Sequence, residues 1–459
     1  PPIPHATGAG PPPARLPADS SHRPHTRFAV EPQIGSERGQ PRPGLFASWD
    51  SDAAGRRWAF RIRTGAVFHD GVPVRAADVL EFIAEVREAV DSFAMKLPYA
   101  RYLSRTRFAA ADDRTVLAES EHPFADILDV FSEFQIARPA ADGRSIVGTG
   151  PYRIAELVAG ARAVLEATGR GHDGVDRIVL QAVPDAEARW EMLRTGTVDV
   201  AMRLDRMESP PARDPRWGWL TATTTLSVIY YLNCAAGIFA APQARLAANL
   251  AVDKQALVRD VMHGLGAVSS TIVSPAHLGM ATAGLDAIPF DPARARSLLD
   301  AIGGPRDLLL RTPTHLPERA PEISRFVAAA LGQVGFDVTV ETETDRPEYA
   351  RQVGRKRIGD LAIFDSSPHS TFRVLDDKIS SASRGVWWQG YHDDEVQALI
   401  ATANAAVEGA AREAAYAACL ARLRANPPWL YLAHPIALTA VRPDAPALAL
   451  APNGTLTIG

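Results

Sequence analysis

The sequence predicts a mixed α/β protein with more than one domain. A chain of 459 residues exceeds what one ordinary core holds, so two or three domains are expected. Residues 308–341 show the pattern of a buried strand, an amphipathic helix and an alternating strand, which together form a βαβ unit. Residues 176–201 repeat this order, with Gly196 at the end of the helix. Two such segments favour a layered architecture in which helices cover a sheet.

Composition narrows the class of protein. The formal net charge is −4 and the isoelectric point is about 6.3. The chain therefore lacks the excess of basic residues that is typical of nucleic-acid-binding proteins. No apolar run approaches the ~20 residues of a membrane-spanning helix. The two cysteines, Cys234 and Cys419, are too few for a disulfide framework or a metal cage, so we expect buried thiols and neither cofactor nor metal. The chain begins Pro-Pro without a secretion signal, and we expect that a signal was removed.

The first informative stretch runs from Trp58 to Val79 and reads WAFRIRTGAVFHDGVPVRAADV. Its first six residues alternate in the manner of a half-buried strand, and a glycine turn and a second short strand follow. An amphipathic helix opens at Ala76. His69 stands beside an aspartate in a turn, where a histidine is more often a local hydrogen-bond partner than a ligand.

A second motif, Gly-Thr-Gly-Pro-Tyr, occupies residues 148–152 and predicts a rigid turn that starts a strand.

Residues 1–43 are rich in Pro, Gly, Arg and His and are expected to be loop or extended chain, with a metal role for His5, His22 and His25 as the weaker alternative. The other expected elements are strands at 108–118 with a turn at Asp112 and Asp113, 226–234, 357–364 and 427–432, and helices at 239–251, 291–299 and 396–423.

The two motifs resemble the signatures of the family 5 extracellular solute-binding proteins, the dipeptide, oligopeptide and nickel receptors of ABC importers. About a dozen identities of the first motif fall in one register. The resemblance implies a two-lobed periplasmic-binding-protein-like fold of type II, in the large cluster with an extra subdomain in the first lobe. It places the first lobe at 1–235 with the subdomain at about 50–150, the second lobe at 236–434 and a return to the first lobe at 435–459. The hinge is expected near 230–240 and 430–440, with ligand bound between the lobes.

The resemblance also implies a function and partners. We expect a monomeric receptor, periplasmic or extracellular, that captures a small-molecule solute and delivers it to the permease subunits of an ABC transporter. The alternative is a ligand-sensing domain of the same fold inside a regulator. A DNA-binding segment upstream of residue 1 would favour the regulator, and a signal peptide there would favour the receptor.

An enzyme is not expected. Ser366, Ser367 and Ser370 lie near His369 and Asp365, but they are adjacent in sequence and sit in no nucleophile elbow. The sequence has no His-x-x-x-His, Cys-x-x-Cys or glycine-rich phosphate loop.

Binding is better supported than catalysis. One loop-rich region brings together two opposite charges and three aromatic side chains, and the predicted ligand contacts there are Asp365, Arg373, Trp387, Trp388 and Tyr391. An arginine presents a planar fork that fits a carboxylate, and tryptophan and tyrosine bury area at low entropic cost. The alternative is that the tryptophans pack the lobe and that Arg373 pairs with Asp376 or Asp377. His369 and Arg138 complete the predicted ligand contacts.

The nature of the solute stays open at this stage. In the family's peptide receptors an Asp within a segment of the type W-x-x-D-x-x-D-P holds the peptide amino terminus, and residues 365–373 depart from that pattern. A carboxylate-bearing solute, such as a small peptide or an amino-acid conjugate, is expected, with a sugar or a metal chelate as other candidates. A metal site of the protein's own is not expected, because His369 is the most plausible donor in the second lobe and one histidine is insufficient.

Overall fold

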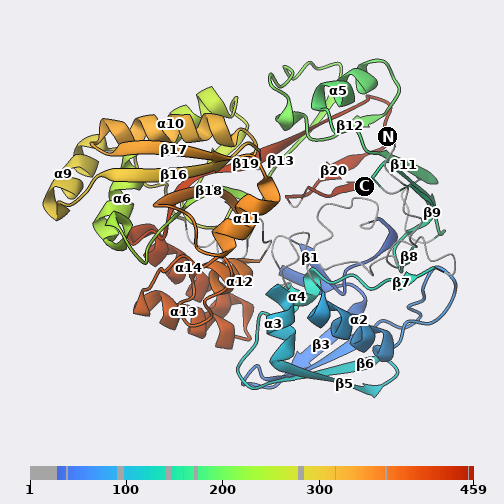
Figure 1. Ribbon diagram of the computed structural model, residues 1–459. Coiled ribbons are helices and arrows are strands. Elements are labelled where there is room, and N and C mark those ends of the chain that lie inside the picture. Colours follow the sequence, from blue (N-terminus) through green and yellow to red (C-terminus); the bar gives the residue numbers. More distant parts are fainter. Residues whose placement is uncertain are drawn as a thin grey trace, which may run out of the picture.

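The computed structural model describes residues 28–37, 40–89, 98–140, 146–158, 160–169, 174–277, 284–315, 317–366, 368, 370–452 and 454–458. Three bodies are visible in Figure 1. The N-terminal subdomain (residues 46–140) is blue to cyan, the second lobe lies opposite it, and the first lobe carries the green strands and the last red strands. The predicted two-lobed α/β fold with an extra subdomain is therefore confirmed. No helix among the described residues is long and apolar enough to cross a membrane.

The second lobe is built on the strand order β19-β14-β18-β16-β17. The predicted βαβ unit is confirmed, because β16 and β17 are parallel and α10 lies between them in sequence. The region predicted as one helix at 396–423 is two helices, α13 and α14. The elements of this lobe are β14 (Ser227–Leu232), η3 (Ile238–Ala240), α6 (Pro242–Ala251), α7 (Lys254–Ala256), η4 (Leu257–Val261), β15 (Gly266–Val268), α9 (Pro292–Ile302), β16 (Asp307–Pro313), α10 (Ala320–Gln333), β17 (Asp337–Glu343), α11 (Arg346–Gly354), β18 (Leu361–Ser366), α12 (Thr371–Val374), η5 (Leu375–Ile379), α13 (Asp394–Ala405) and α14 (Gly409–Ala425).

One long strand, β19 (Trp429–Val441), joins the two lobes. Its first residues pair with β14, and its residues from Ile436 onward pair with β13 (Gly218–Thr223) of the first lobe. The backbone N–H of Thr224 donates to Pro435 O at 2.9 Å. Pro435 lies where β19 stops pairing with β14 and starts pairing with β13. The expected lobe boundary and hinge stay predictions, and the strand pairing marks 433–436 as the segment where the chain passes between the lobes.

The N-terminal subdomain is an antiparallel sheet of order β3-β4-β6-β5 with helices beside it. The first motif supplies β4 and α2, as its alternation and its amphipathic pattern predict. The aromatic rings of Phe46, Phe60 and Phe131 meet in its core, with centroids 4.7 to 5.4 Å apart. The elements are β3 (Phe46–Ser51), β4 (Arg57–Ile62), α2 (Ala76–Glu88), α3 (Pro98–Ser104), β5 (Thr106–Asp112), β6 (Thr115–Ser120), α4 (Ile127–Ser132) and β7 (Arg138–Pro139).

The first lobe holds the remaining strands. Its small apolar core lies around Leu193, Leu204 and Leu438, beneath α5. Its elements are β8 (Ile146–Val147), β9 (Tyr152–Val158), β10 (Arg162–Ala167), β11 (Arg177–Gln181), α5 (Ala186–Arg194), β12 (Val200–Ala201), η2 (Leu204–Arg206), β13, β20 (Leu448–Leu450) and β21 (Leu456–Ile458), whereas β1 (Ile34–Glu37) and β2 (Gln40–Pro43) lie against α4 of the N-terminal subdomain.

The two sequence motifs meet in space. The backbone N–H of Gly148 donates to His69 Nδ1 at 3.3 Å, and His69 Nε2 lies 3.0 Å from the carbonyl oxygen of Gly150. His69 is therefore a hydrogen-bond partner, although the backbone that it contacts is distant in sequence. A Cβ at Gly150 would stand 2.6 Å from Phe28 O, so glycine is required for the close approach of the N-terminal segment.

That N-terminal segment corrects one expectation. Residues 1–43 were expected to be loop or extended chain outside the core, but Ala29, Val30 and Ile34 are buried. Ala29 and Val30 pack with Tyr152 and Leu165, and the absence of a side chain at Gly148 allows the backbone of Ala29 to come close. His5, His22 and His25 lie outside the described residues.

Candidate functional site

Arg373 of α12 reaches from the second lobe to the N-terminal subdomain. Its Nη1 donates to Glu133 Oε2 at 3.0 Å and to the hydroxyl of Tyr99, and its guanidinium lies 4.4 Å from the Tyr99 ring centroid. Glu133 directly follows α4, and Tyr99 is in α3. The two acidic neighbours in sequence, Asp376 and Asp377, are not its hydrogen-bond partners in the structure.

A second arginine crosses the same interface in the opposite direction. Arg101 of α3 donates through Nη2 to Asp377 Oδ1 at 2.6 Å and also to Asp376. Both aspartates lie in η5 and are buried. The ring of Phe372 also packs against Tyr102 and Phe124 across this interface, so the contact between the N-terminal subdomain and the second lobe combines apolar packing with charge pairs. Such pairs are costly to break singly, because a buried charge is then left uncompensated.

Lys378 lies behind these pairs and links them to other predicted residues. It is 4 % exposed, and its Nζ donates to the Tyr231 hydroxyl at 3.2 Å and lies 5.8 Å from the centroid of the Trp387 ring. Burial lowers the pKa of Lys378 to about 8, and the carboxylates of Asp377 and Asp365 oppose that effect. The pKa of a buried amine such as this one shifts when a charge near it is added or removed.

Asp365 is held by an arginine of its own lobe. It pairs with Arg346 at 3.2 Å, and the Arg346 guanidinium lies 4.8 Å from the Phe364 ring centroid. The Phe364 and Trp387 rings are 5.0 Å apart. The structure thus gathers three of the predicted residues, Asp365, Arg373 and Trp387, around Lys378.

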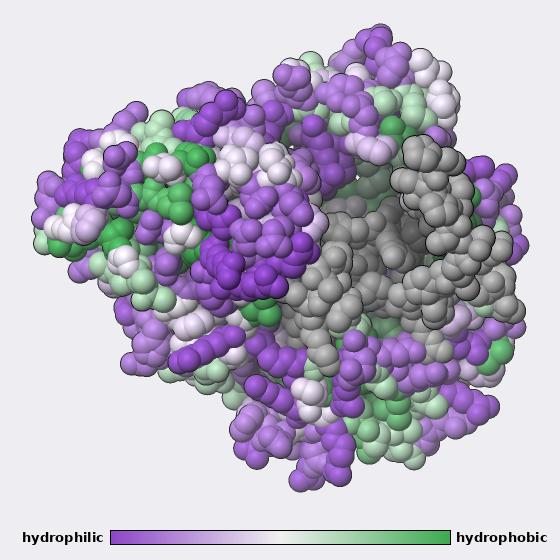
Figure 2. All heavy atoms as spheres, in the orientation of Figure 1, coloured by the Kyte–Doolittle hydropathy of each residue, from purple (hydrophilic) through white to green (hydrophobic). Residues whose placement is uncertain are grey.

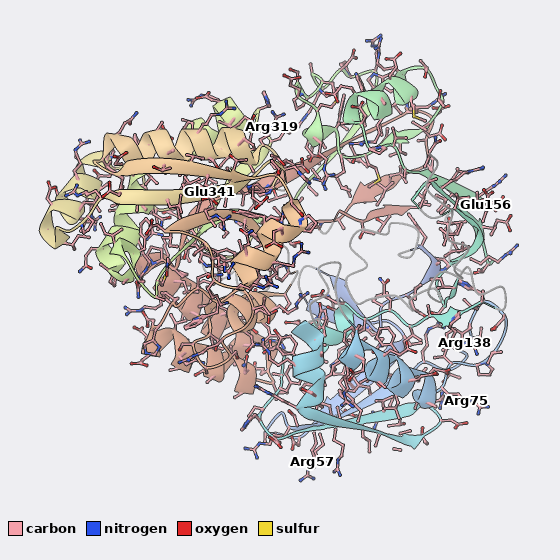
Figure 3. The ribbon with its side chains drawn as sticks, viewed as in Figure 1. Arg57, Arg75, Arg138, Glu156, Arg319 and Glu341 are labelled. Carbon is pink, nitrogen blue, oxygen red and sulfur yellow. The ribbon has the colours of Figure 1, made fainter. Side chains whose placement is uncertain are left out.

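Three other predicted residues make contacts away from Lys378. Trp388 Nε1 donates to the Tyr391 carbonyl at 2.7 Å, and the buried Tyr391 hydroxyl donates to the Asn426 carbonyl at 3.1 Å. Arg138 pairs with Asp70 at 2.8 Å, and Figure 3 shows it on the side of the N-terminal subdomain away from the second lobe. Their role as ligand contacts stays a prediction. His369 lies outside the described residues.

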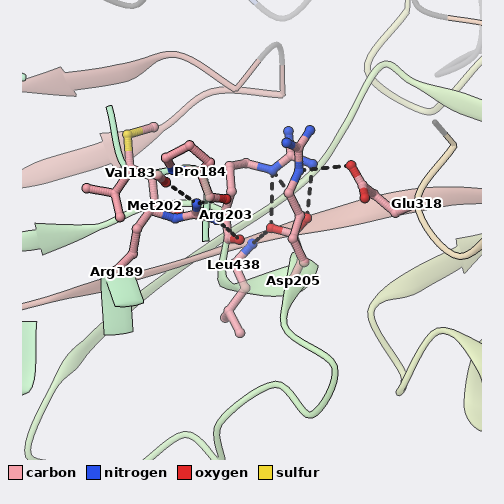
Figure 4. Close-up of polar contacts among 9 residues, drawn as sticks. Val183, Pro184, Arg189, Met202, Arg203, Asp205, Glu318 and Leu438 are labelled. Atoms are coloured by element: carbon pink, nitrogen blue, oxygen red, sulfur yellow. Dashed lines mark hydrogen bonds and ion pairs between the residues drawn. The ribbon is translucent and has the colours of Figure 1, made fainter. Parts of the chain in front are cut away.

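The first lobe contacts the second through another set of charges, drawn in Figure 4. Arg206 of η2 pairs with Glu318 of the second lobe at 3.1 Å. The pKa of Arg206 is lowered by burial and by the nearby Arg203, while Glu318 and Asp205 oppose that change. Asp205 accepts from the N–H of Leu438 at 3.0 Å, which ties this cluster to β19. Arg189 fixes the loop behind the cluster through its bonds to the carbonyls of Val183, Pro184, Met202 and Arg203.

Charge pairs therefore join the second lobe both to the N-terminal subdomain and to the first lobe. Hydrophilic residues, purple in Figure 2, cover most of the visible face of the second lobe. Among the described residues, no three His, Cys, Asp or Glu side chains are placed to hold a metal ion. Charged side chains of this kind form strong, charge-assisted hydrogen bonds with the carboxylate or ammonium group of a small molecule.

Sequence reasoning missed several of these residues. Tyr99, Arg101 and Glu133 lie about 240 to 275 positions from their partners, so no local pattern connects them. A usable signal was present in Leu375–Ile379, where three charges interrupt an apolar run and every residue is buried. Charged residues are rarely buried unless they are paired.

Comparison with known proteins agrees with this geometry. The sequence profile described as "Bacterial extracellular solute-binding proteins, family 5 Middle" matches residues 40–394. The chain is 24% identical to the nickel-binding periplasmic protein of Escherichia coli strain K12, over 90% of this chain and 84% of that protein. It is also 24% identical to the glutathione-binding protein GsiB of Pectobacterium atrosepticum, over 85% of this chain and 79% of that protein.

Solved structures show the same fold at lower identity. NikA from Brucella suis in complex with Fe(III)-EDTA superposes with a TM-score of 0.77, at 20% identity and 98% coverage of each chain. AgaA from A. tumefacien R10 in complex with agropinic acid gives a TM-score of 0.75, at 18% identity, over 97% of this chain and 95% of that one.

Proposed function

Because this chain belongs to family 5 of the bacterial extracellular solute-binding proteins, we propose that it is the substrate-binding receptor of an ABC importer. In this proposal it captures a small carboxylate-bearing solute between its lobes and presents it to the membrane permease. The site of action is the periplasm or the cell exterior, where such receptors work. The relatives named for nickel and glutathione support the receptor class and leave the solute open.

One observation carries the carboxylate preference. Arg373 uses Nη1 for Tyr99 and Glu133, whereas its buried Nε has no hydrogen-bond partner among the described residues. A buried N–H without an acceptor costs roughly 1–3 kcal/mol. A carboxylate that binds across the guanidinium fork would satisfy Nε and would match its planar geometry.

The surrounding charges favour a solute that carries both signs. Asp376, Asp377 and Glu133 neighbour Arg101 and Arg373, so an ammonium group could be accepted beside a carboxylate. Peptides and amino-acid conjugates have this composition. Asp365 already pairs with Arg346 at 3.2 Å, so this acid is less suited to hold a peptide amino terminus than an aspartate without a counter-ion.

The proposal is tested first by a ligand screen. Purified protein is mixed with amino acids, dipeptides, glutathione, opine-type conjugates, sugars and metal chelates, and the melting temperature is measured. A bound solute stabilises the folded state by a free energy that grows with the logarithm of the ratio of its concentration to its dissociation constant. We expect carboxylate-bearing zwitterions to raise the melting temperature and neutral sugars to leave it unchanged.

Calorimetry with the best solute then tests Arg373. Removal of the protein's partner from a buried charge pair with a ligand costs about 2–5 kcal/mol of binding free energy. Arg373→Ala should therefore weaken binding of the solute at least thirtyfold. Arg61→Ala is the matched control, because Arg61 is exposed and pairs with the exposed Asp50 within the N-terminal subdomain. Equal affinities of wild type and Arg373→Ala, with a folded variant, would refute the role of Arg373. A solute without a carboxylate as the best ligand would refute the carboxylate class.

A further inference from the structure

A second candidate ligand site lies where the two lobes share β19. It is a groove of about 360 Å³. The first-lobe loop 209–213 forms one wall, the second-lobe turn 263–265 forms the other, and Leu438 contributes from β19. A cavity of this size holds a small organic molecule.

Both walls are fixed at the junction between the lobes. The carbonyl of Leu265 accepts from the N–H of Ile436 at 3.0 Å, and its side chain packs against the first-lobe core. The opposite wall is tied to the second lobe by Arg319, whose Nη2 donates to Met207 O at 2.5 Å and to Glu208 O at 3.1 Å. Figure 3 shows Arg319 at this junction. The groove is thus a product of the arrangement of the lobes.

The lining has a definite chemical character. Pro210, Pro211 and Leu265 offer apolar surface, and Arg213 and His263 are the basic side chains of the lining. No acidic side chain belongs to the lining among the described residues. A cationic guanidinium and an imidazole beside proline rings match a carboxylate on an apolar body.

The backbone at His263 supplies a second, independent observation. His263 has φ 52°, in the left-handed region that favours glycine, and Gly264 follows with φ 73°. A non-glycine residue held there costs on the order of 1 kcal/mol or more, and such residues cluster at ligand sites. Glycine at 263 would relieve this strain, so the imidazole is retained at a cost to the fold.

We propose that this groove binds a small carboxylate with an apolar body, at a site separate from Arg373. The inference goes beyond the receptor function proposed above. Because residues of both lobes line the groove, its ligand would bind to one relative arrangement of the lobes in preference to others.

The test uses 4-fluorobenzoate as the probe and 4-fluorobenzamide as its uncharged counterpart, each titrated by ¹⁹F NMR. We expect 4-fluorobenzoate to bind with a millimolar dissociation constant and the amide to bind at least fivefold more weakly. Arg213→Ala should weaken 4-fluorobenzoate binding at least fivefold. Arg216→Ala is the control, because Arg216 is paired with Asp214 at 2.6 Å and does not line the groove.

His263→Gly separates binding from folding. We expect this variant to lose affinity for 4-fluorobenzoate while its melting temperature equals or exceeds that of wild type. Arg373→Ala should bind the probe like wild type, so failure of this proposal leaves the receptor proposal intact. Loss of binding in Arg373→Ala, equal binding of both probes, or equal affinities of Arg213→Ala and Arg216→Ala would overturn the assignment.

Discussion

Tyr416 of the second lobe donates a hydrogen bond to Asp126 of the N-terminal subdomain, and both side chains are buried. Ser370 donates in the same way to Asp129 at 3.2 Å. Burial is the largest cause that raises the pKa of Asp126, to about 7, and it raises the pKa of Asp129 as well. The two carboxyls titrate as a pair. The contact between the N-terminal subdomain and the second lobe is therefore linked to protonation.

The first prediction concerns the pH dependence of stability. Asp126 has a folded pKa above its reference value of 3.8, so its contribution to stability is full below that value and is lost as pH rises to about 7. Asp126→Asn keeps an acceptor for Tyr416 and removes this titration, and Arg412 keeps Asp129 as a neighbour. We expect urea unfolding at a series of pH values to show that wild type loses stability relative to Asp126→Asn between about pH 4 and 7.

Asp112→Asn is the control for that measurement. Asp112 is exposed, and hydrogen bonds from the Arg114 backbone and the Thr115 hydroxyl lower its pKa, so its effect has the opposite sign. Its contribution to stability is present above 3.8 and is lost in acid. Parallel stability profiles of wild type and Asp126→Asn would contradict the assignment to Asp126.

The second prediction concerns His434 at the junction between the lobes. Its Nδ1 lies 3.0 Å from Ser227 Oγ and 3.2 Å from Leu226 O, and burial lowers its pKa to about 4. The unfolded chain binds the proton more strongly, so wild type should lose stability as pH falls from about 6.5 to 4. His434→Gln should show less of this loss in the same urea series. An unchanged acid limb would show that His434 is not the group responsible.

The third prediction tests the meeting of the two sequence motifs. Gly150→Ala would place a Cβ 2.6 Å from Phe28 O and 2.7 Å from the Ala29 carbonyl carbon, and backbone atoms cannot yield as a flexible side chain does. We expect a loss of about 1–3 kcal/mol in the free energy of unfolding. Gly332→Ala in α10, where nothing lies within 4 Å, should instead gain about 0.5–1 kcal/mol. Equal effects of the two variants would disprove the close approach.

The fourth prediction separates ligand binding from the ion pair between Arg373 and Glu133. Arg373→Lys keeps the charge but cannot present a planar fork, so calorimetry should show only partial recovery of affinity relative to Arg373→Ala. Glu133→Gln removes the partner carboxylate and leaves Arg373 in place. If Arg373 binds the solute, Glu133→Gln should retain most of the affinity for the solute carboxylate. If Arg373 only joins the two bodies, Glu133→Gln and Arg373→Ala should have similar affinities.

The sequence by itself determined the local structure and the fold class. Periodicity placed β4, α2 and the βαβ unit of β16, α10 and β17, because these elements bury one face and their patterns are written in adjacent residues. The start of α9 is likewise local, because Asp291 directly precedes the helix and accepts from the N–H of Arg294. The two motifs were sufficient for the resemblance to family 5.

Only the tertiary structure decided which charges meet. Arg373 could have paired with Asp376 or Asp377, which are a helical turn away, but Glu133 and Tyr99 are its partners and Arg101 takes both aspartates. An ion pair depends on distance in space and on desolvation, and neither is encoded in the spacing of residues along one segment. For the same reason the buried Lys378 and the groove beside β19 emerged only when the lobes were placed together.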